Sequence, residues 1–226
     1  MPDCETFPSP NHSERKGGLT PRLIVLHYTG MADGPSARAR LCDPEAEVSA
    51  HWLIHEHGQA EALVPEDRRA WHAGAGAWCG VEDINSRSIG IEIVNPGNAP
   101  FAARQMDALE DLLSAIMSRH AIGPEGVIGH SDMAPGRKID PGPRFDWRRL
   151  ARQGLALWPE GLGADLPLAH SLTRIGYPDA PQRLHAFRLR FRPGASGPED
   201  ETDRRIAAAA SDLFMRCRGE GGGARV

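Results

Sequence analysis

Three short apolar runs predict buried strands in the first two thirds of the chain. Each is rich in leucine, isoleucine or valine and is followed by polar, glycine or proline residues. The runs cover residues 23–28, 88–94 and 127–130. Runs of this length with few polar positions are typical of strands buried on both faces. Residues 51–55 and 60–64 have the pattern of a hairpin, and Gly58 lies in its turn.

The segment between the second run and the third has the apolar spacing of a helix. Apolar side chains recur there three and four positions apart, and Gly123-Pro124 ends the pattern. The residues in this pattern are Leu109, Leu112, Leu113, Ile116 and Met117. Strands that alternate with a helix, together with a hairpin, predict an α/β domain with a mixed central β-sheet flanked by helices. We expect this domain over residues 21–160, after an irregular lead-in over residues 1–20.

The last third of the chain has the apolar spacing of three short helices. The first ends at Gly176, the second ends at Pro193-Gly194, and the third has Asp200 or Thr202 near its cap. We expect a small three-helix domain over residues 166–218, with a disordered tail over residues 219–226. Because so few residues can form only a small hydrophobic core, we expect this domain to pack against the first one.

Composition excludes several classes of partner. The 226 residues carry a net charge of −4, which gives no reason to expect nucleic acid or an anionic membrane as a partner. No apolar run approaches the roughly 18 residues that span a bilayer. The N-terminus lacks a basic start followed by an apolar stretch, so it is not typical of a secretory signal. We therefore expect a cytoplasmic protein, or a periplasmic one if the native N-terminus is missing.

Residues able to bind metal or move protons end all three strand-like runs. They are His27, Glu92 and His130. Functional side chains converge at strand ends in α/β sheets, because loops and helix termini leave a crevice there. The proline and glycine content of residues 130–142 predicts a loop without helix that can fold back over these ends. Two histidines and a carboxylate can form a catalytic zinc site with a fourth position for water, although ten histidines allow many pairings.

Four motifs then occur in the order found in one family. They are Leu26-His27-Tyr28-Thr29, Trp71-His72-Ala73-Gly74, Ser88-Ile89-Gly90-Ile91-Glu92, and the segment from His130-Ser131-Asp132 to Lys138-Ile139-Asp140-Pro141-Gly142. The chain resembles the type-2 N-acetylmuramoyl-L-alanine amidases, zinc enzymes related to the peptidoglycan recognition proteins. The resemblance is greatest to the AmiD-like branch, which carries a helical peptidoglycan-binding-type domain after the catalytic one. It runs from Leu23 to Phe214.

The resemblance assigns zinc to His27, His130 and Asp140, and it makes Glu92 the general base. The alternative for Glu92 is a buried structural carboxylate. Lys138 precedes Asp140 by two positions, so in an extended loop both side chains would point to the same side. Its ammonium group would stabilise the oxyanion formed during amide hydrolysis, and the alternative is a solvated surface lysine.

Substrate contacts are less well defined by the sequence. His72 and Trp71 can line the wall of a cleft, but a loop histidine and a buried tryptophan are equally plausible interpretations. Arg137 can bind a substrate carboxylate, and the alternative is a role at the surface. His51 and His55 would share one strand face and are interpreted as structural, because the family's metal set is already filled.

The chain departs from related proteins at two places. Phage-type amidases have a catalytic tyrosine where this sequence has Ala50, so Glu92 is left to carry the proton. In the helical domain, the usual Gly-x-x-Asp-x-x-Thr signature is replaced by Gly197-Pro198-Glu199-Asp200-Glu201-Thr202, with threonine one position early. Two roles therefore stay open for this domain: it binds glycan, or it supports the catalytic domain.

The resemblance implies zinc-dependent hydrolysis of the amide bond between N-acetylmuramic acid, including its 1,6-anhydro form, and L-alanine of peptidoglycan stem peptides. With no secretory signal, we expect the reaction to serve cytoplasmic cell-wall recycling, with a muropeptide as substrate. The alternatives are a non-catalytic peptidoglycan-recognition protein and an envelope amidase that acts on wall polymer. The complete set of His27, Glu92, His130 and Asp140 favours the enzyme.

Overall fold

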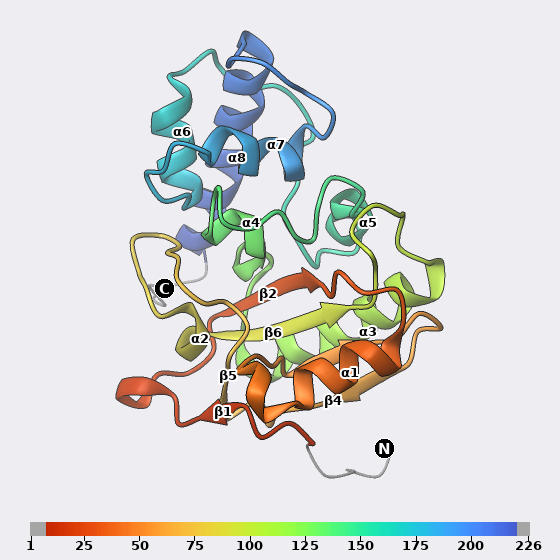
Figure 1. The fold of residues 1–226 in the computed structure, drawn as a ribbon. Coiled ribbons are helices and arrows are strands. Elements are labelled where there is room, and N and C mark those ends of the chain that lie inside the picture. The colour runs from red at the N-terminus through yellow and green to blue at the C-terminus, as the bar shows by residue number, and fades with distance from the viewer. Residues whose placement is uncertain (1–7, 221–226) are drawn as a thin grey trace.

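The fold centres on a mixed five-stranded sheet, here described from a computed structural model that covers residues 8–220. In space the strands follow the order β4-β3-β6-β2-β7. Figure 1 labels β4, β6 and β2 of this sheet. Their bounds are β2 Leu23–Tyr28, β3 Trp52–Ile54, β4 Ala60–Ala62, β6 Ser88–Ile93 and β7 Val127–Gly129. Strands β3, β6, β2 and β7 run parallel, and β4 pairs antiparallel with β3. The predicted mixed sheet and its hairpin are thus confirmed.

Helices cover the sheet and form the C-terminal part of the chain (Figure 1). They are α1 Gly34–Cys42, α2 Ile84–Arg87, α3 Ala103–His120, α4 His130–Met133, α5 Trp147–Arg152, α6 Leu168–Ile175, α7 Arg183–Phe191 and α8 Glu201–Glu220. The sequence pattern predicted α3, α6, α7 and α8. It missed α1, α2 and α5. Asp200 caps α8, since its Oδ1 accepts a hydrogen bond of 3.0 Å from the Asp203 amide.

Alternating side chains of the central strands serve two different cores. Ile24 and Leu26 of β2 pack with isoleucines of β6 against α3. Leu23 and Val25 point to the other face, where they pack with residues of the C-terminal helices such as Phe187. Both sets are fully buried, as expected for parallel strands covered on both sides.

The C-terminal helices share this second core with the sheet. Trp78, from the segment before α2, is fully buried and contacts the rings of Tyr177 and Phe214 edge-on. Figure 1 shows α6, α7 and α8 stacked beyond α4, with the sheet on the other side of α4. The sheet therefore supplies apolar surface that three short helices alone would lack.

Residues 130–142 do not form the uninterrupted loop that the sequence predicted. Its first four residues, His130–Met133, make the helical turn α4. Proline interrupts a helix that would contain it, and it keeps the residue before it out of the helical conformation. The first proline after His130 is Pro135, so residues 130–133 lie too early to be affected. Ala134 accordingly leaves the helical region, with φ −134° and ψ 54°. One turn of helix thus fits between β7 and the proline.

The two ends of the described chain are more ordered than predicted. Residues 8–20 include β1 (His12–Ser13), which pairs with β5 (Arg69–Ala70), and a 3-10 turn over Lys16–Gly18. Residues 1–7 of the predicted lead-in lie outside the described residues. The predicted disordered tail starts at residue 219, but α8 extends through Glu220, and residues 221–226 lie outside the described part. No helix within residues 8–220 is long and apolar enough to cross a membrane.

Candidate active site

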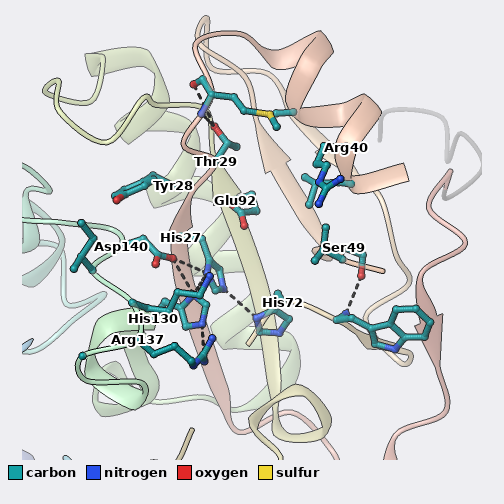
Figure 2. A pocket seen from close by; sticks show the side chains of 18 residues that line it. His27, Tyr28, Thr29, Arg40, Ser49, His72, Glu92, His130, Arg137 and Asp140 are labelled. Carbon is teal, nitrogen blue, oxygen red and sulfur yellow. Dashed lines mark hydrogen bonds and ion pairs between the residues drawn. The ribbon is translucent and has the colours of Figure 1, made fainter. Parts of the chain in front are cut away.

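The parallel strands bring their polar ends to one edge of the sheet. His27 on β2 pairs in register with Glu92 on β6, and Leu26 pairs with Gly129, the residue before His130. Figure 2 shows His27, Glu92 and His130 beside one cleft. The convergence expected from the strand ends is confirmed.

His27, His130 and Asp140 form a compact, buried cluster. The Nδ1 atoms of the two histidines lie 2.9 Å apart, and Asp140 Oδ2 lies 2.9 Å from His27 Nδ1 and 3.0 Å from His130 Nδ1. These three are the described residues that together offer donor atoms to a metal ion. Two imidazoles and one carboxylate match the donor set of catalytic zinc sites, which keep a further position open.

The hydrogen bond at the far side of His130 leaves its Nδ1 free to bind metal. Its Nε2 lies 2.9 Å from the carbonyl oxygen of Ala73. A carbonyl only accepts hydrogen bonds, so Nε2 carries the proton and Nδ1 carries a lone pair. Metal-binding histidines are commonly held by such a second hydrogen bond.

A longer chain of hydrogen bonds has the same effect on His27. The Ser88 hydroxyl donates to the carbonyl of Ile84 at 2.6 Å, so its oxygen accepts from His72 Nε2 at 3.2 Å. His72 Nδ1 is then the acceptor for His27 Nε2–H at 3.0 Å. The chain leaves His27 Nδ1 unprotonated and directed at Asp140.

Burial keeps the imidazoles of His27 and His72 neutral. It lowers the pKa of His27 to about 4, with a further contribution from the neighbouring His130. It also lowers the pKa of His72 well below the usual value, and the nearby His27 adds to this effect. Neutral imidazole is the form that binds metal, so the ligand form is available at pH 7.

A glycine makes room for His72 on the sheet. Gly90 of β6 lies beneath the imidazole, and a Cβ atom at this position would approach His72 Cγ to 2.4 Å. Such a contact is far inside van der Waals distance. The glycine in the predicted strand therefore allows His72 to reach His27.

Glu92 enters the cleft from the strand next to His27 (Figure 2). Burial, and then the negative charge of Asp140, raise the pKa of Glu92 to about 8, while the Lys138 ammonium acts in the opposite direction. Within the described residues, its buried Oε2 has no hydrogen-bond partner. A cation held by the cluster would lower this pKa by Coulombic attraction. The arrangement suits a carboxylate that exchanges protons inside the cleft.

Arg137 and Lys138 lie in the turn between α4 and Asp140. The Lys138 amide donates to the Ala134 carbonyl at 3.1 Å, so the segment is a turn and not the extended loop assumed from the sequence. Lys138 nevertheless lines the cleft together with Asp140. Arg137 donates to the carbonyls of Ala73 and Ala75. Its guanidinium thus joins this turn to the Trp71–Gly76 segment, and its predicted contact with substrate stays a prediction.

The cleft has a volume of about 570 Å³, and its walls include Trp71 and His72. Sequence reasoning missed the wall formed by α1, which contributes Ala37, Arg40 and Leu41. A local signal for this helix was present: Asp33 Oδ1 accepts from the Ser36 amide at 2.7 Å, and a proline lies in the first turn.

The fold and the cleft define a hydrolase with a candidate metal centre. Residues 17–143 match the family described as N-acetylmuramoyl-L-alanine amidase, and the chain belongs to this family. The family resemblance inferred from the four motifs is therefore confirmed.

Two sequence relatives illustrate the match. N-acetylmuramoyl-L-alanine amidase AmiD of Escherichia coli K12 is 37% identical in an alignment that covers 85% of this chain and 83% of AmiD. The 1,6-anhydro-N-acetylmuramyl-L-alanine amidase AmpD of Enterobacter cloacae is 36% identical in an alignment that covers 66% of this chain and 88% of AmpD.

Solved structures extend the likeness to most of the fold. The complex of Escherichia coli AmiD with the substrate anhydro-N-acetylmuramic acid-L-Ala-D-gamma-Glu-L-Lys superimposes with a TM-score of 0.79 at 33% identity, covering 89% of this chain and 93% of AmiD. Pseudomonas aeruginosa AmpDh3 in complex with anhydromuramic pentapeptide gives a TM-score of 0.77 at 30% identity, covering 89% of this chain and 95% of AmpDh3.

Proposed function

We propose that this chain is a zinc amidase that hydrolyses the bond between N-acetylmuramic acid, including its 1,6-anhydro form, and L-alanine of peptidoglycan stem peptides. The observation that carries the proposal is the buried cluster of His27, His130 and Asp140 beside Glu92 in one cleft. Membership of the amidase family supports the reaction. The anhydromuramyl peptides bound by AmiD and AmpDh3 support the substrate class.

His27 and His130 would hold zinc through Nδ1, and Asp140 through its carboxylate. When bound, zinc supplies Lewis acidity toward the amide carbonyl and lowers the pKa of water in the cleft. The two histidines fit this role because their Nε2 protons are engaged by His72 and by the Ala73 carbonyl. Their lone pairs thus face Asp140.

Glu92 acts as the general base and then as the general acid. It takes a proton from the attacking water and returns it to the nitrogen of the leaving L-alanyl peptide. Ala50 occupies the position of the tyrosine found in phage-type relatives, so Glu92 carries this proton alone. Lys138 lines the same cleft, and its ammonium stabilises the negative charge that develops on the carbonyl oxygen.

His72 has a positioning role in this proposal, and Trp71 has a binding role. The hydrogen bonds of His72 to His27 and Ser88 engage both of its ring nitrogens, so neither is left for the substrate. Trp71 lines the cleft and presents an apolar surface to a sugar ring or a peptide.

The decisive experiment is mass spectrometry of a defined anhydromuramyl tripeptide incubated with the purified chain. We expect release of the free tripeptide, loss of this activity with a zinc chelator, and recovery when zinc is restored. An intact substrate in the presence of bound zinc would contradict the proposal for soluble fragments. Wall polymer would then be tested as the substrate of an envelope amidase, and binding without turnover would indicate a recognition protein.

We place the reaction in cell-wall recycling, on soluble muropeptides in the cytoplasm. The soluble anhydromuramyl peptides found in complexes of similar enzymes support this class of substrate. The cytoplasmic location stays a prediction, and cell fractionation tests it. Recovery of the protein in the periplasm would contradict it.

A further inference from the structure

A buried ionic network joins the C-terminal helices to the helical turn that carries His130. Arg190 of α7 donates to Asp132 Oδ2 of α4 at 3.0 Å, and the Tyr177 hydroxyl donates to Asp132 Oδ1 at 2.6 Å. The exposed fractions are 2% for Arg190, 0% for Asp132 and 3% for Tyr177. Both carboxylate oxygens of Asp132, a residue of the amidase domain, thus accept hydrogen bonds from residues of the C-terminal module.

Arg190 has further contacts on the amidase side of this interface. It donates to the carbonyls of Val127 in β7 and Leu157 after α5, at 3.3 and 3.2 Å. Its guanidinium carbon lies 3.9 Å from the centre of the Trp147 ring. These partners fix the guanidinium against the strand that leads to His130.

Asp132 also contacts the backbone next to the proposed metal-binding residues. Its Oδ2 accepts a hydrogen bond of 2.8 Å from the amide of Gly129, the residue immediately before His130. The amide of Ser131, the second residue of α4, donates to the Asp140 carbonyl at 2.9 Å. The position of α4 therefore sets the backbone of both His130 and Asp140.

Arg188 of the same helix offers an internal comparison. It pairs with Asp203 of α8, and both residues belong to the C-terminal helices. Arg188 and Asp203 are also buried. Of these two buried ion pairs on α7, the Arg190 pair reaches the segment that carries His130, and the Arg188 pair stays within the C-terminal helices.

We propose that Arg190 and Tyr177 are positioning residues for the metal centre, and that they act through Asp132. The C-terminal helices complete the amidase site from behind α4, in addition to any contact with glycan. This inference rests on the proposed metal site at His27, His130 and Asp140. It assigns the helical module a role in metal affinity that a separate glycan-binding domain would not have.

The test is the zinc affinity of the full-length chain, measured by competition with a chromogenic chelator at a temperature where circular dichroism shows every variant to be folded. The variants are Arg190→Lys, Tyr177→Phe and the matched control Arg188→Lys. Tyr177→Phe removes one hydroxyl and keeps the ring that packs against Trp78. It serves as the informative variant if Arg190→Lys fails to fold.

We expect Tyr177→Phe and Arg190→Lys to weaken zinc binding by about ten-fold, the lower end of the effect of outer-shell partners. Arg188→Lys is expected to lower the melting temperature of the metal-free protein but to keep zinc affinity within about two-fold. Equal zinc affinities in all folded variants would overturn the inference, because a merely stabilising role moves only the melting temperature. Failure of the wild-type chain to bind zinc would instead overturn the proposed metal site.

Discussion

His27 and Glu92 are register partners on the adjacent parallel strands β2 and β6. Neighbouring strands lie about 4.8 Å apart, and paired positions of a parallel ladder present their side chains on the same face. One group of the candidate metal centre and the candidate proton carrier are therefore placed by the sheet itself. The segment after β7 contributes the remaining parts, since His130 begins α4 and Lys138 and Asp140 follow this turn of helix.

Glu92 lines the cleft but does not belong to the proposed metal-binding cluster, so its loss is expected to affect catalysis more than metal binding. We expect Glu92→Gln to reduce kcat on anhydromuramyl tripeptide by about a hundred-fold or more, because it removes general acid–base catalysis. Zinc content, measured by mass spectrometry of the metal, is expected to stay at the wild-type level. Glu45→Gln, an exposed exchange, is the matched control. Turnover within a few-fold of wild type would show that Glu92 is not the base.

The raised pKa of Glu92 also predicts a pH-dependent stability of the metal-free protein. The folded value is about 8, whereas an unfolded glutamate titrates near about 4.3. The folded state thus holds a proton that the unfolded state has lost. The stabilising contribution is complete below about pH 4.3 and is lost as the pH rises through 8.

Urea unfolding in the presence of a chelator measures this effect. Between about pH 5 and pH 8, the free energy of unfolding of wild type is expected to fall relative to that of Glu92→Gln. The slope is at most about 1.4 kcal/mol per pH unit. A difference between the two proteins that stays constant over this range would mean that Glu92 titrates normally in the folded state.

Replacement of His72 by phenylalanine distinguishes two roles for this residue, orientation of His27 and contact with the substrate. His72→Phe keeps a ring above Gly90 but breaks the hydrogen bond that orients His27. We expect zinc affinity to fall by about ten- to a hundred-fold, as for other outer-shell partners. Exposed His57 provides the control exchange, His57→Phe. Unchanged zinc affinity with a raised KM would identify His72 as a substrate contact instead.

Gly90→Ala tests the space that the His72 ring occupies. The added methyl would lie 2.4 Å from His72 Cγ, so the ring or the strand has to move. We expect a loss of about 1 to 3 kcal/mol in stability, which is typical of overpacked cores, together with weaker zinc binding.

Thermal unfolding and chelator competition measure the two effects of this exchange. The control is Gly161→Ala, since a Cβ atom at Gly161 meets nothing within 4 Å. A fully stable Gly90→Ala protein with normal zinc affinity would contradict the proposed role of this close approach.

Local patterns were sufficient for much of the fold. The apolar runs that became β2, β6 and β7 and the helical spacing of α3 and α8 are visible along the chain. Strands buried on both faces appear as apolar runs, and a helix buried on one face repeats its apolar positions every three or four residues. The same approach missed α1 despite the capping signal at Asp33, and it excluded the turn α4 by extending the effect of Pro135 too far.

The strand ends visible in the sequence place His27, Glu92 and His130 at the active edge, and the family motifs point to Asp140. The orientation of His27 and the support of α4 depend instead on contacts between distant parts of the folded chain. His72 lies 45 positions from His27, and Arg190 lies 58 positions from Asp132. No local period links such pairs, because the first contact arises only when the segment that carries His72 packs on the sheet, and the second only when α7 packs against α4.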